Sequence, residues 1–135
     1  MRFVDTNILL YAISRSATEK AKARIANEIL EDPSLALSVQ VLQEFYVQAT
    51  HRSRRDRLTH DQAFRLLESL LRFRIFELSV ELVRAAAASS ERYRISYWDA
   101  AIVEAARASA CEVLLSEDLN HGQDYDGVRV ENPFV

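Results

Sequence analysis

The chain has 135 residues, of which 49% are hydrophobic and 27% charged, an ordinary globular mixture that excludes a disordered or collagen-like protein. This length is typical of one domain, so we expect a single domain over residues 1–135. The 2 Gly and 2 Pro are too few turn formers for an all-β protein, so helices should dominate. Cys111 is the only cysteine, which excludes an intrachain disulfide and a cysteine-based zinc site.

Charge and hydropathy also limit the partners of the chain. The net charge is -3, so there is no general electrostatic attraction to nucleic acid, and any such partner must be held locally. No apolar run approaches the roughly 20 residues that span a bilayer, and the first residues lack the apolar segment of a signal peptide. We therefore expect a cytoplasmic protein with no membrane partner.

Short apolar runs alternate with amphipathic helical patterns along the chain. We expect strands at residues 2–4, 35–37, 74–78, 113–116 and 128–130. We expect helices at residues 8–13, 18–30, 39–50, 59–71, 80–93 and 97–108. Short buried strands that alternate with helices are typical of a parallel sheet covered on both faces. The pattern therefore predicts an α/β protein with a three-layer α/β/α fold and a short, mainly parallel central sheet of four to five strands.

Four acidic residues are predicted to meet at one edge of this sheet. Asp5 ends the first strand, and Asp118 follows the fourth strand. Glu44 lies in the second turn of the helix after the second strand, and Asp99 lies in the first turn of the last helix. Because the reactive crevice of an open α/β sheet lies beyond the carboxyl ends of its strands, we expect all four side chains to face one crevice.

Each acid also has a purely structural interpretation. Asp5 could cap the helix that follows it, and Asp99 could form a capping box with Ser96. Glu44 could be a solvated charge at a helix flank, and Asp118 could be an exposed turn residue. Taken together, the four favour a shared site, because the topology directs them to the same edge and no lysine lies near them in the sequence.

Converging carboxylates favour a bound cation. Two unit charges about 4 Å apart repel by roughly 4 kcal/mol at an effective dielectric near 20, so such groups either take up protons or bind cations. Oxygen-only ligands suit Mg²⁺ or Mn²⁺ rather than zinc. Such an ion activates water and neutralises phosphate oxygens, so the pattern predicts phosphodiester hydrolysis.

The chain resembles the PIN-domain ribonucleases in four segments: Asp5-Thr6-Asn7, Glu44, Tyr97-Trp98-Asp99-Ala100 and Leu114-Leu115-Ser116-Glu117-Asp118. Within that family, its length and motifs are most similar to the VapC toxins of bacterial and archaeal toxin–antitoxin systems. The resemblance covers essentially the whole chain. It implies a PIN-like fold and a Mg²⁺- or Mn²⁺-dependent endoribonuclease that is the toxin of such a pair.

The resemblance also implies roles for individual residues. The family's acids, which hold metal and position the attacking water, correspond to Asp5, Glu44, Asp99 and Asp118. Asn7 corresponds to a polar residue after the first acid, and Ser116 corresponds to a hydroxyl position that supports the site by hydrogen bonding. Asn120 stands where many members carry a further acid, which leaves open whether one or two metal ions bind.

The partners implied by the resemblance are an RNA substrate, a small VapB-like antitoxin that covers the acidic crevice, and a second copy of the chain in a homodimer. The two helices expected at 18–30 and 39–50 are rich in apolar side chains, including Ile25, Ile29, Phe45 and Tyr46. They carry more of these than one small sheet obviously needs. Part of this surface is therefore expected to form a groove for an amphipathic helix of the antitoxin.

Two further segments have open interpretations. One contains four closely spaced arginines, Arg52, Arg54, Arg55 and Arg57. Arginine binds RNA phosphates bidentately, but these residues suit a solvated loop equally well. The other segment is Tyr97 and Trp98, for which core packing is favoured over stacking on a base.

Rival functions are a phosphatase, a housekeeping nuclease and a binding module. A phosphatase of the haloacid dehalogenase type also places an Asp after the first strand, but it needs a second Asp where this chain has Asn7, and no lysine follows Lys22. A PIN nuclease that is not a toxin would carry the same acids. A PIN-like module that has lost catalysis would have no reason to keep four clustered carboxylates.

Overall fold

The computed structural model describes residues 1–135 and contains one five-stranded sheet in which every pair of neighbouring strands is parallel. The spatial order of the strands is β3-β2-β1-β4-β5. Their bounds are β1 (Arg2–Val4), β2 (Ala36–Ser38), β3 (Arg74–Phe76), β4 (Val113–Leu115) and β5 (Arg129–Glu131). The predicted α/β class and parallel sheet are confirmed.

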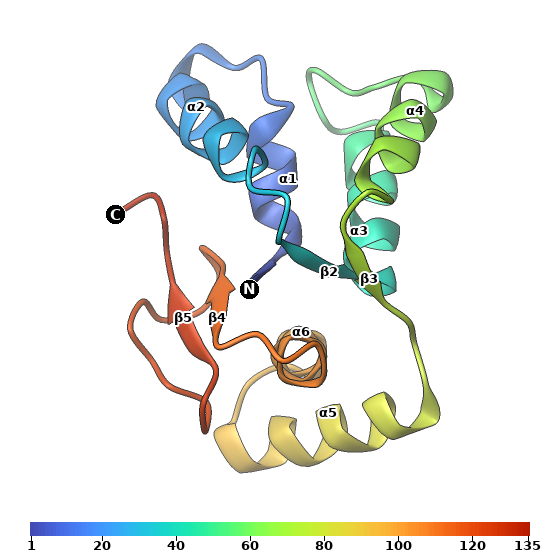
Figure 1. Ribbon diagram of the computed structural model, residues 1–135. Helices are drawn as coiled ribbons and strands as arrows, with labels where there is room; N and C mark the ends of the chain where they lie inside the picture. Colours follow the sequence, from blue (N-terminus) through green and yellow to red (C-terminus); the bar gives the residue numbers. More distant parts are fainter.

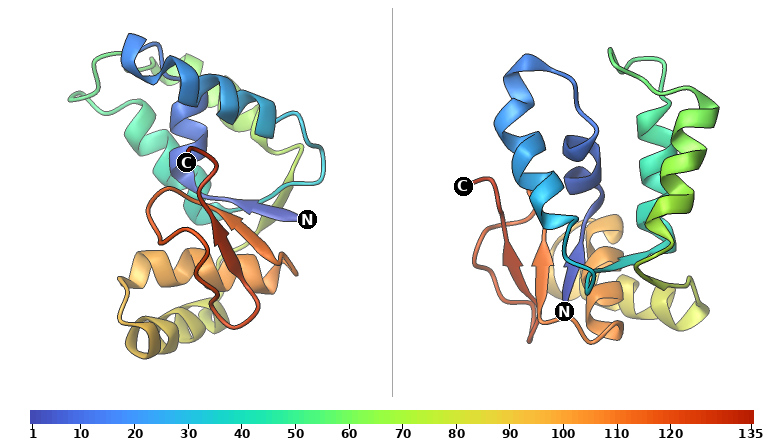
Figure 2. Two further views of the ribbon diagram at one scale, coloured as in Figure 1. Left: turned by 90° about the vertical axis from the view of Figure 1, so that its left-hand side faces the viewer. Right: turned by 45° about the horizontal axis from the view of Figure 1, so that its top comes forward.

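Six α-helices cover the two faces of the sheet. Their bounds are α1 (Thr6–Ala12), α2 (Lys20–Ile29), α3 (Val39–Ala49), α4 (His60–Leu70), α5 (Val80–Tyr93) and α6 (Tyr97–Ala108), and a 3-10 turn, η1 (Ala17–Glu19), precedes α2. The helices α1 to α4 lie on one face, and α5 and α6 lie on the other (Figures 1 and 2). This is the three-layer arrangement expected from the alternation of strands and helices. No helix is long and apolar enough to cross a membrane.

The main core consists of 25 buried residues between the sheet and its helices. It includes Phe3 of β1 and Leu114 of β4, both fully buried, and Phe45 of α3. A small second cluster of Ala86, Ala100 and Ala101 joins α5 to α6. Because β1 and β4 are buried on both faces, they lack the alternating pattern of a half-exposed strand. Cys111 is a free cysteine buried in this core.

The first helix begins earlier than its apolar pattern predicts. The expected start was Ile8, but α1 starts at Thr6 because the Asp5 side chain accepts a 2.7 Å hydrogen bond from the Thr6 amide. Thr6 and Asn7 are therefore the first helical residues rather than part of a turn. This capping rigidly fixes Asp5 and Asn7 at the carboxyl end of β1.

The chain reverses its direction of growth across the sheet between β1 and β4. From β1 it builds outward through β2 to β3, then returns through α5 and α6 to place β4 on the other side of β1. In open parallel sheets, ligands bind at such a topological switch point, beyond the carboxyl ends of the strands. Asp5 follows β1 and Ser116 follows β4, so both residues flank the switch point.

Candidate active site

A pocket of about 160 Å³ opens at this end of the sheet. All four acids named from the sequence line it: Asp5, Glu44, Asp99 and Asp118. They come from the end of β1, from α3, from the first turn of α6 and from the loop after β4. No Lys, Arg or His side chain is among the lining residues. The pocket therefore gathers carboxylates from four parts of the chain without a basic group to compensate them.

Asp5 is the most buried acid of the pocket, with 5% of its surface exposed. Its Oδ1 accepts the Thr6 amide, and its Oδ2 accepts a 2.7 Å hydrogen bond from Ser116 Oγ. Burial raises the pKa of Asp5 from 3.8 to about 7, because the two hydrogen bonds do not offset the loss of hydration. The negative charges of Asp118 and Glu44 contribute to this raised pKa. Asp5 thus caps α1 and is also electrostatically coupled to the other acids.

Asn7 and Ser116 join the first and fourth strand ends. Asn7 Nδ2 donates to Asp118 Oδ2 at 3.0 Å, and Asn7 Oδ1 accepts from the Glu117 amide at 3.3 Å. Ser116 Oγ donates to Asp5 and accepts from the Asp118 amide. Both side chains therefore orient the two carboxylates nearest the switch point.

Glu44 is held by Thr6 and Gln40, two residues to which the sequence pattern assigns no role. Its Oε1 accepts hydrogen bonds from Thr6 Oγ1 at 3.1 Å and from Gln40 Nε2 at 3.3 Å. Gln40 and Gln48 also line the pocket. Their position could have been inferred from the sequence, because Gln40, Glu44 and Gln48 are spaced by four residues. This spacing places all three side chains on one face of a helix.

Asp99 and Trp98 lie at the start of α6. Ser96 is the N-cap of this helix, and its Oγ accepts from the Asp99 amide at 3.0 Å. Burial raises the pKa of Asp99, and the negative charge of Asp118 adds to this. The expectation of core packing is wrong for Trp98, which is 65% exposed and lines the pocket. The apolar positions of α6 that face the core begin only at Ala100.

A neighbouring acid, Glu117, is turned away from the pocket. Its carboxylate accepts Lys22 Nζ at 2.8 Å and the Tyr11 hydroxyl at 2.7 Å. These hydrogen bonds lower the pKa of Glu117 against the effect of its partial burial. Lys22 therefore neutralises Glu117 and leaves the pocket carboxylates uncompensated. Asn120 occupies the position at which many PIN-domain ribonucleases carry a further acid. Its side chain donates to Gln123 and does not line the pocket.

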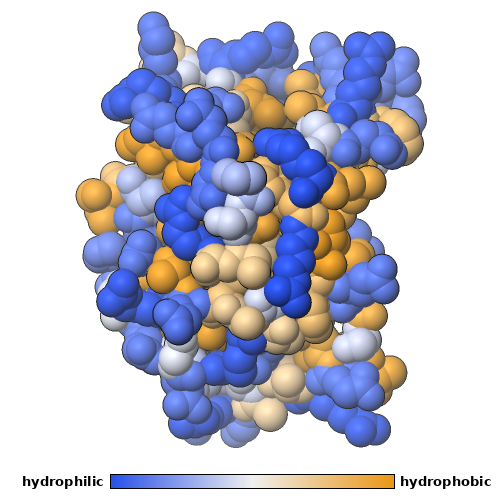
Figure 3. All heavy atoms as spheres, viewed as in Figure 1, coloured by the Kyte–Doolittle hydropathy of each residue, from blue (hydrophilic) through white to orange (hydrophobic).

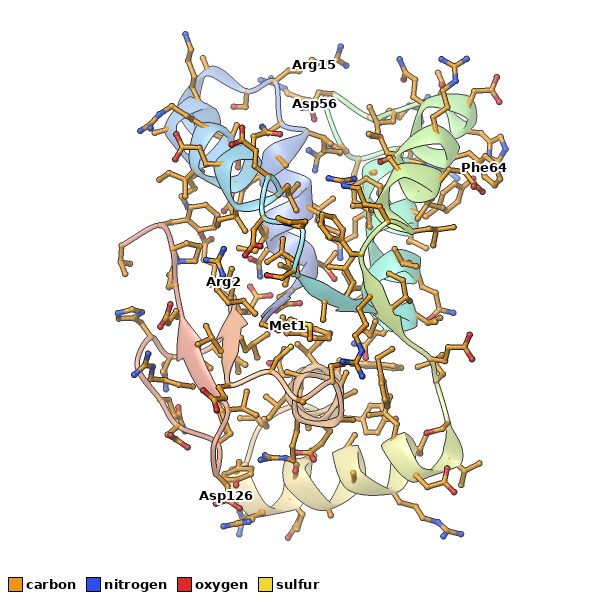
Figure 4. All side chains as sticks on the ribbon, viewed as in Figure 1. Met1, Arg2, Arg15, Asp56, Phe64 and Asp126 are labelled. Atoms are coloured by element: carbon orange, nitrogen blue, oxygen red, sulfur yellow. The ribbon has the colours of Figure 1, made fainter.

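The four arginines between α3 and α4 do not form one uniform patch. Arg52, Arg55 and Arg57 are exposed. Arg54 instead turns inward, where it donates to the Leu10 carbonyl at 3.3 Å and lies 3.0 Å from Asp56. The Asp56 carboxylate also accepts the Arg15 amide at 2.8 Å, and this hydrogen bond holds its pKa below the usual range (Figure 4). The solvated-loop interpretation is therefore wrong for Arg54, which ties this loop to α1.

Replacing Arg54 with Ala should lower the free energy of unfolding by about 1–3 kcal/mol, because it removes a hydrogen bond from a charged group and leaves Asp56 without its cation. Replacing exposed Arg55 with Ala should change stability little. Urea unfolding of the two variants measures the difference. Equal stabilities would contradict an anchoring role for Arg54.

The pocket carboxylates keep free ligand atoms. Glu44 Oε2 and Asp118 Oδ1 accept no hydrogen bond, since the bonds to these two residues end on their other oxygens. As placed, no three acidic, histidine or cysteine side chains form a complete metal-ligand cluster. The site is thus a ring of oxygen donors around an open pocket.

Comparison with known proteins places this geometry in a family. The chain shares 25% identity with a chain of a toxin–antitoxin complex from Klebsiella pneumoniae, with a TM-score of 0.71 over 98% of both chains. It shares 20% identity with a chain of FitAcB from Neisseria gonorrhoeae, with a TM-score of 0.68 over 99% of both chains.

A third structure, the sarcin-ricin loop cleaving toxin VapC20 of Mycobacterium tuberculosis, has a TM-score of 0.66 at 17% identity and aligns 87% of this chain with 90% of its own. No curated protein sequence matches the chain. The family model described as PIN domain matches residues 2–123, which is most of the sequence and includes all four pocket acids. The chain therefore belongs to the PIN domain family.

Proposed function

We propose that this single-domain chain is a Mg²⁺- or Mn²⁺-dependent endoribonuclease and the toxin of a toxin–antitoxin pair. The observation that carries the proposal is the convergence of four carboxylates on one pocket that has no basic lining residue. The likeness to a toxin–antitoxin complex and to an RNA-cleaving toxin supports the same assignment. The cytoplasm would supply both the RNA and the metal ion.

The donor set of the pocket fits a hard divalent cation. It offers carboxylate oxygens without thiol or imidazole, which suits Mg²⁺ or Mn²⁺ rather than zinc. Asp5, Glu44, Asp99 and Asp118 would hold the ion, and Asn7 and Ser116 would orient Asp5 and Asp118. A bound ion would supply an activated water and neutralise phosphate oxygens. The free oxygens of Glu44 and Asp118 are available for this purpose.

The charge of the site depends on pH through the ionisation of Asp5. With a pKa of about 7, Asp5 is protonated in a large fraction of metal-free molecules at neutral pH. It must lose that proton before it can act as an anionic ligand. The hydrogen bonds from Thr6 and Ser116 favour the ionised form, so they keep the group within reach of ionisation at physiological pH.

Cleavage of total cellular RNA in Mg²⁺ or Mn²⁺, with and without a chelator, tests the proposed function. Replacing Asp118 with Asn should reduce the cleavage rate by roughly a hundredfold or more, because an anionic ligand is lost. Asp118 is exposed, so the fold should be retained. The matched control is Glu117→Gln, which alters the adjacent acid that faces away from the pocket and should keep most of the activity. Cleavage that persists in chelator would contradict metal dependence.

The exposed arginines are proposed to contact RNA phosphates. Changing Arg52, Arg55 and Arg57 to Ala together should weaken RNA binding and reduce the slope of log affinity against log salt by about 0.7 per lost contact on single-stranded RNA. Arg54 is left unchanged so that folding is not disturbed. Fluorescence anisotropy over a salt series gives both slopes. An identical slope in the triple variant would mean that these three side chains are only solvated.

A protein partner is also proposed, on the helix layer remote from α5 and α6. A cavity of about 350 Å³ is lined there mainly by apolar residues of α1, α2 and α4, with Phe45 of α3. The expectation that Ile29 and Phe45 are surplus to the core is wrong, because both are buried in it. The candidate groove for an amphipathic antitoxin helix is therefore this cavity, which α2 and Phe45 of α3 help to line.

Co-expression with the neighbouring small reading frame, followed by purification, tests the antitoxin proposal, and light scattering of the isolated chain tests for the homodimer. We expect a complex that does not cleave RNA until the partner is removed. A chain that binds no neighbouring product and is harmless when expressed alone would favour the housekeeping nuclease instead. Loss of all cleavage in a folded, metal-loaded protein would favour the inactive binding module.

A further inference from the structure

Trp98 is the one large aromatic side chain at the acidic pocket, and it is not used by the proposed metal site. It is 65% exposed, whereas Ile102, which lines the same pocket, is buried. An exposed indole ring that lines a polar pocket offers a flat apolar face to whatever binds in that pocket.

The backbone of Trp98 is fixed by a hydrogen bond, and its ring contacts one other aromatic ring. Its backbone carbonyl accepts a 3.3 Å hydrogen bond from Gln40 Nε2, which ties the start of α6 to α3. The Tyr97 ring meets it edge-on, with centroids 5.0 Å apart and an interplanar angle of 86°. Tyr97 itself packs against the alanine cluster between α5 and α6. Trp98 therefore presents an exposed aromatic ring, backed by Tyr97, on a helix start that is fixed to α3.

We propose that Trp98 stacks on a nucleobase of the RNA, next to the phosphate that is cleaved. The pocket carries four carboxylates and no basic side chain, so phosphate groups find no attractive protein charge there. A neutral aromatic face can bind RNA beside these acids, because stacking does not depend on charge and every base has a π-face. The inference rests on the proposed ribonuclease function and adds the residue that binds the base.

A protein segment is a poorer occupant for this place. The acidic pocket has few apolar lining residues, and Trp98 stands at its mouth. A much more apolar groove of about 490 Å³ lies elsewhere, between α3 and α4, where hydrophobic side chains reach the surface (Figure 3). A partner helix would bury more apolar area in that groove or in the helix-layer cavity than at Trp98.

The chain contains a single tryptophan, so its fluorescence reports on Trp98 alone. The wild-type protein first maps a cleavage site in cellular RNA. An RNA oligonucleotide of the sequence around that site then serves as the probe, and every protein in the binding measurements carries Asp118→Asn so that the probe is not cleaved. Saturating the protein with this probe should quench the tryptophan emission. Removing one base at a time from the probe should abolish the quenching at one position beside the scissile phosphate.

Variants test whether the contact contributes to binding. By anisotropy, Trp98→Leu should weaken probe binding roughly ten- to hundredfold, and Trp98→Phe should restore most of it, because a smaller aromatic face still stacks. The control is Phe64→Leu, which changes another exposed aromatic residue that projects from α4 away from the pocket (Figure 4). It should bind the probe as the protein with Asp118→Asn alone does. Melting temperatures confirm that all three variants fold.

The two ideas can fail separately. If the wild type cleaves RNA but the tryptophan of the Asp118→Asn protein is not quenched and Trp98→Leu binds the probe normally, the stacking proposal is overturned while the nuclease stands. A Trp98→Leu variant that loses only binding of the co-expressed partner also overturns it, in favour of a protein contact. If a folded, metal-loaded wild type cleaves no RNA, the proposed function itself fails.

Discussion

Replacing Asp5 with Asn should abolish RNA cleavage and, in the absence of metal at alkaline pH, make the protein more stable. The carboxylate is 5% exposed and lies among other acids, so ionising it in the folded state is unfavourable. Asn is nearly the same size and has no charge to bury. The cleavage rate should fall by roughly a hundredfold or more, because the most buried anionic ligand is lost.

The direction of the stability change follows from the two pKa values of Asp5. The pKa is about 7 in the folded protein and 3.8 as the unperturbed reference, so between these values the folded state binds more protons than the unfolded state. The free energy of unfolding of the wild type should therefore fall as pH rises from about 4 to about 7, by at most about 4 kcal/mol. Above pH 7 this contribution is constant and unfavourable.

The Asn variant should lack that dependence. Its amide group cannot accept both the Thr6 amide and the Ser116 hydroxyl, so the gain at pH 8 should be smaller than the full cost, about 2 kcal/mol. Urea unfolding in chelator at pH 6 and pH 8 measures both proteins. Glu91→Gln, an exposed change on α5, controls for the general effect of removing a charge. Parallel pH profiles for wild type and Asp5→Asn would show that the proton on Asp5 does not influence stability.

Mg²⁺ or Mn²⁺ should raise the melting temperature, because the ion binds the folded pocket and relieves the repulsion among its carboxylates. At 100 times the dissociation constant the stabilisation is about 2.7 kcal/mol. For a chain of this size that corresponds to a shift of roughly 5–10 °C. Replacing Asp99 with Asn should reduce the shift, since it removes one of the four oxygen donors. Glu117→Gln should leave it unchanged, because Glu117 is bound to Lys22 instead.

The same titration should depend on pH. Below about pH 7 the ion competes with the proton on Asp5. The apparent dissociation constant for the metal ion should therefore increase up to about tenfold for each unit by which the pH falls. Thermal unfolding over a range of Mn²⁺ concentrations at pH 6, 7 and 8 gives these constants. A melting temperature that stays constant up to millimolar Mn²⁺, in a well-folded sample, would argue against a shared metal site.

The secondary structure and the four acids could be predicted because their signals are local. The apolar run Val113–Leu115 reads as a buried strand by itself, and Asp5 and Asp118 stand directly after strands. Glu44 is the only charged residue of α3. In a parallel sheet the carboxyl ends of strands share one edge, so residues that end strands are brought together whatever the details of packing. The convergence of the acids is a consequence of topology.

Side-chain direction could not be predicted in the same way, because it depends on partners distant in sequence. Lys22 pairs with Glu117, Arg54 turns toward the Leu10 carbonyl, and Ser116 donates to Asp5 across 111 positions of the chain. The direction of the Trp98 side chain could not be predicted for a related reason. A single helical turn before Asp99 contains too few positions to show whether its tryptophan faces the core or the pocket.

The sequence by itself determined the α/β class, the order of the elements and the identity of the four acids, because strand and helix periodicity and residue chemistry are encoded over short stretches. Only the tertiary structure decided that Asp5 is buried deeply enough to hold a proton near neutral pH, that Arg54 serves the fold while Arg52 is exposed, and that Trp98 stands at the pocket. These properties arise from desolvation and long-range hydrogen bonds, which exist only once β1, β4, α3 and α6 are packed together.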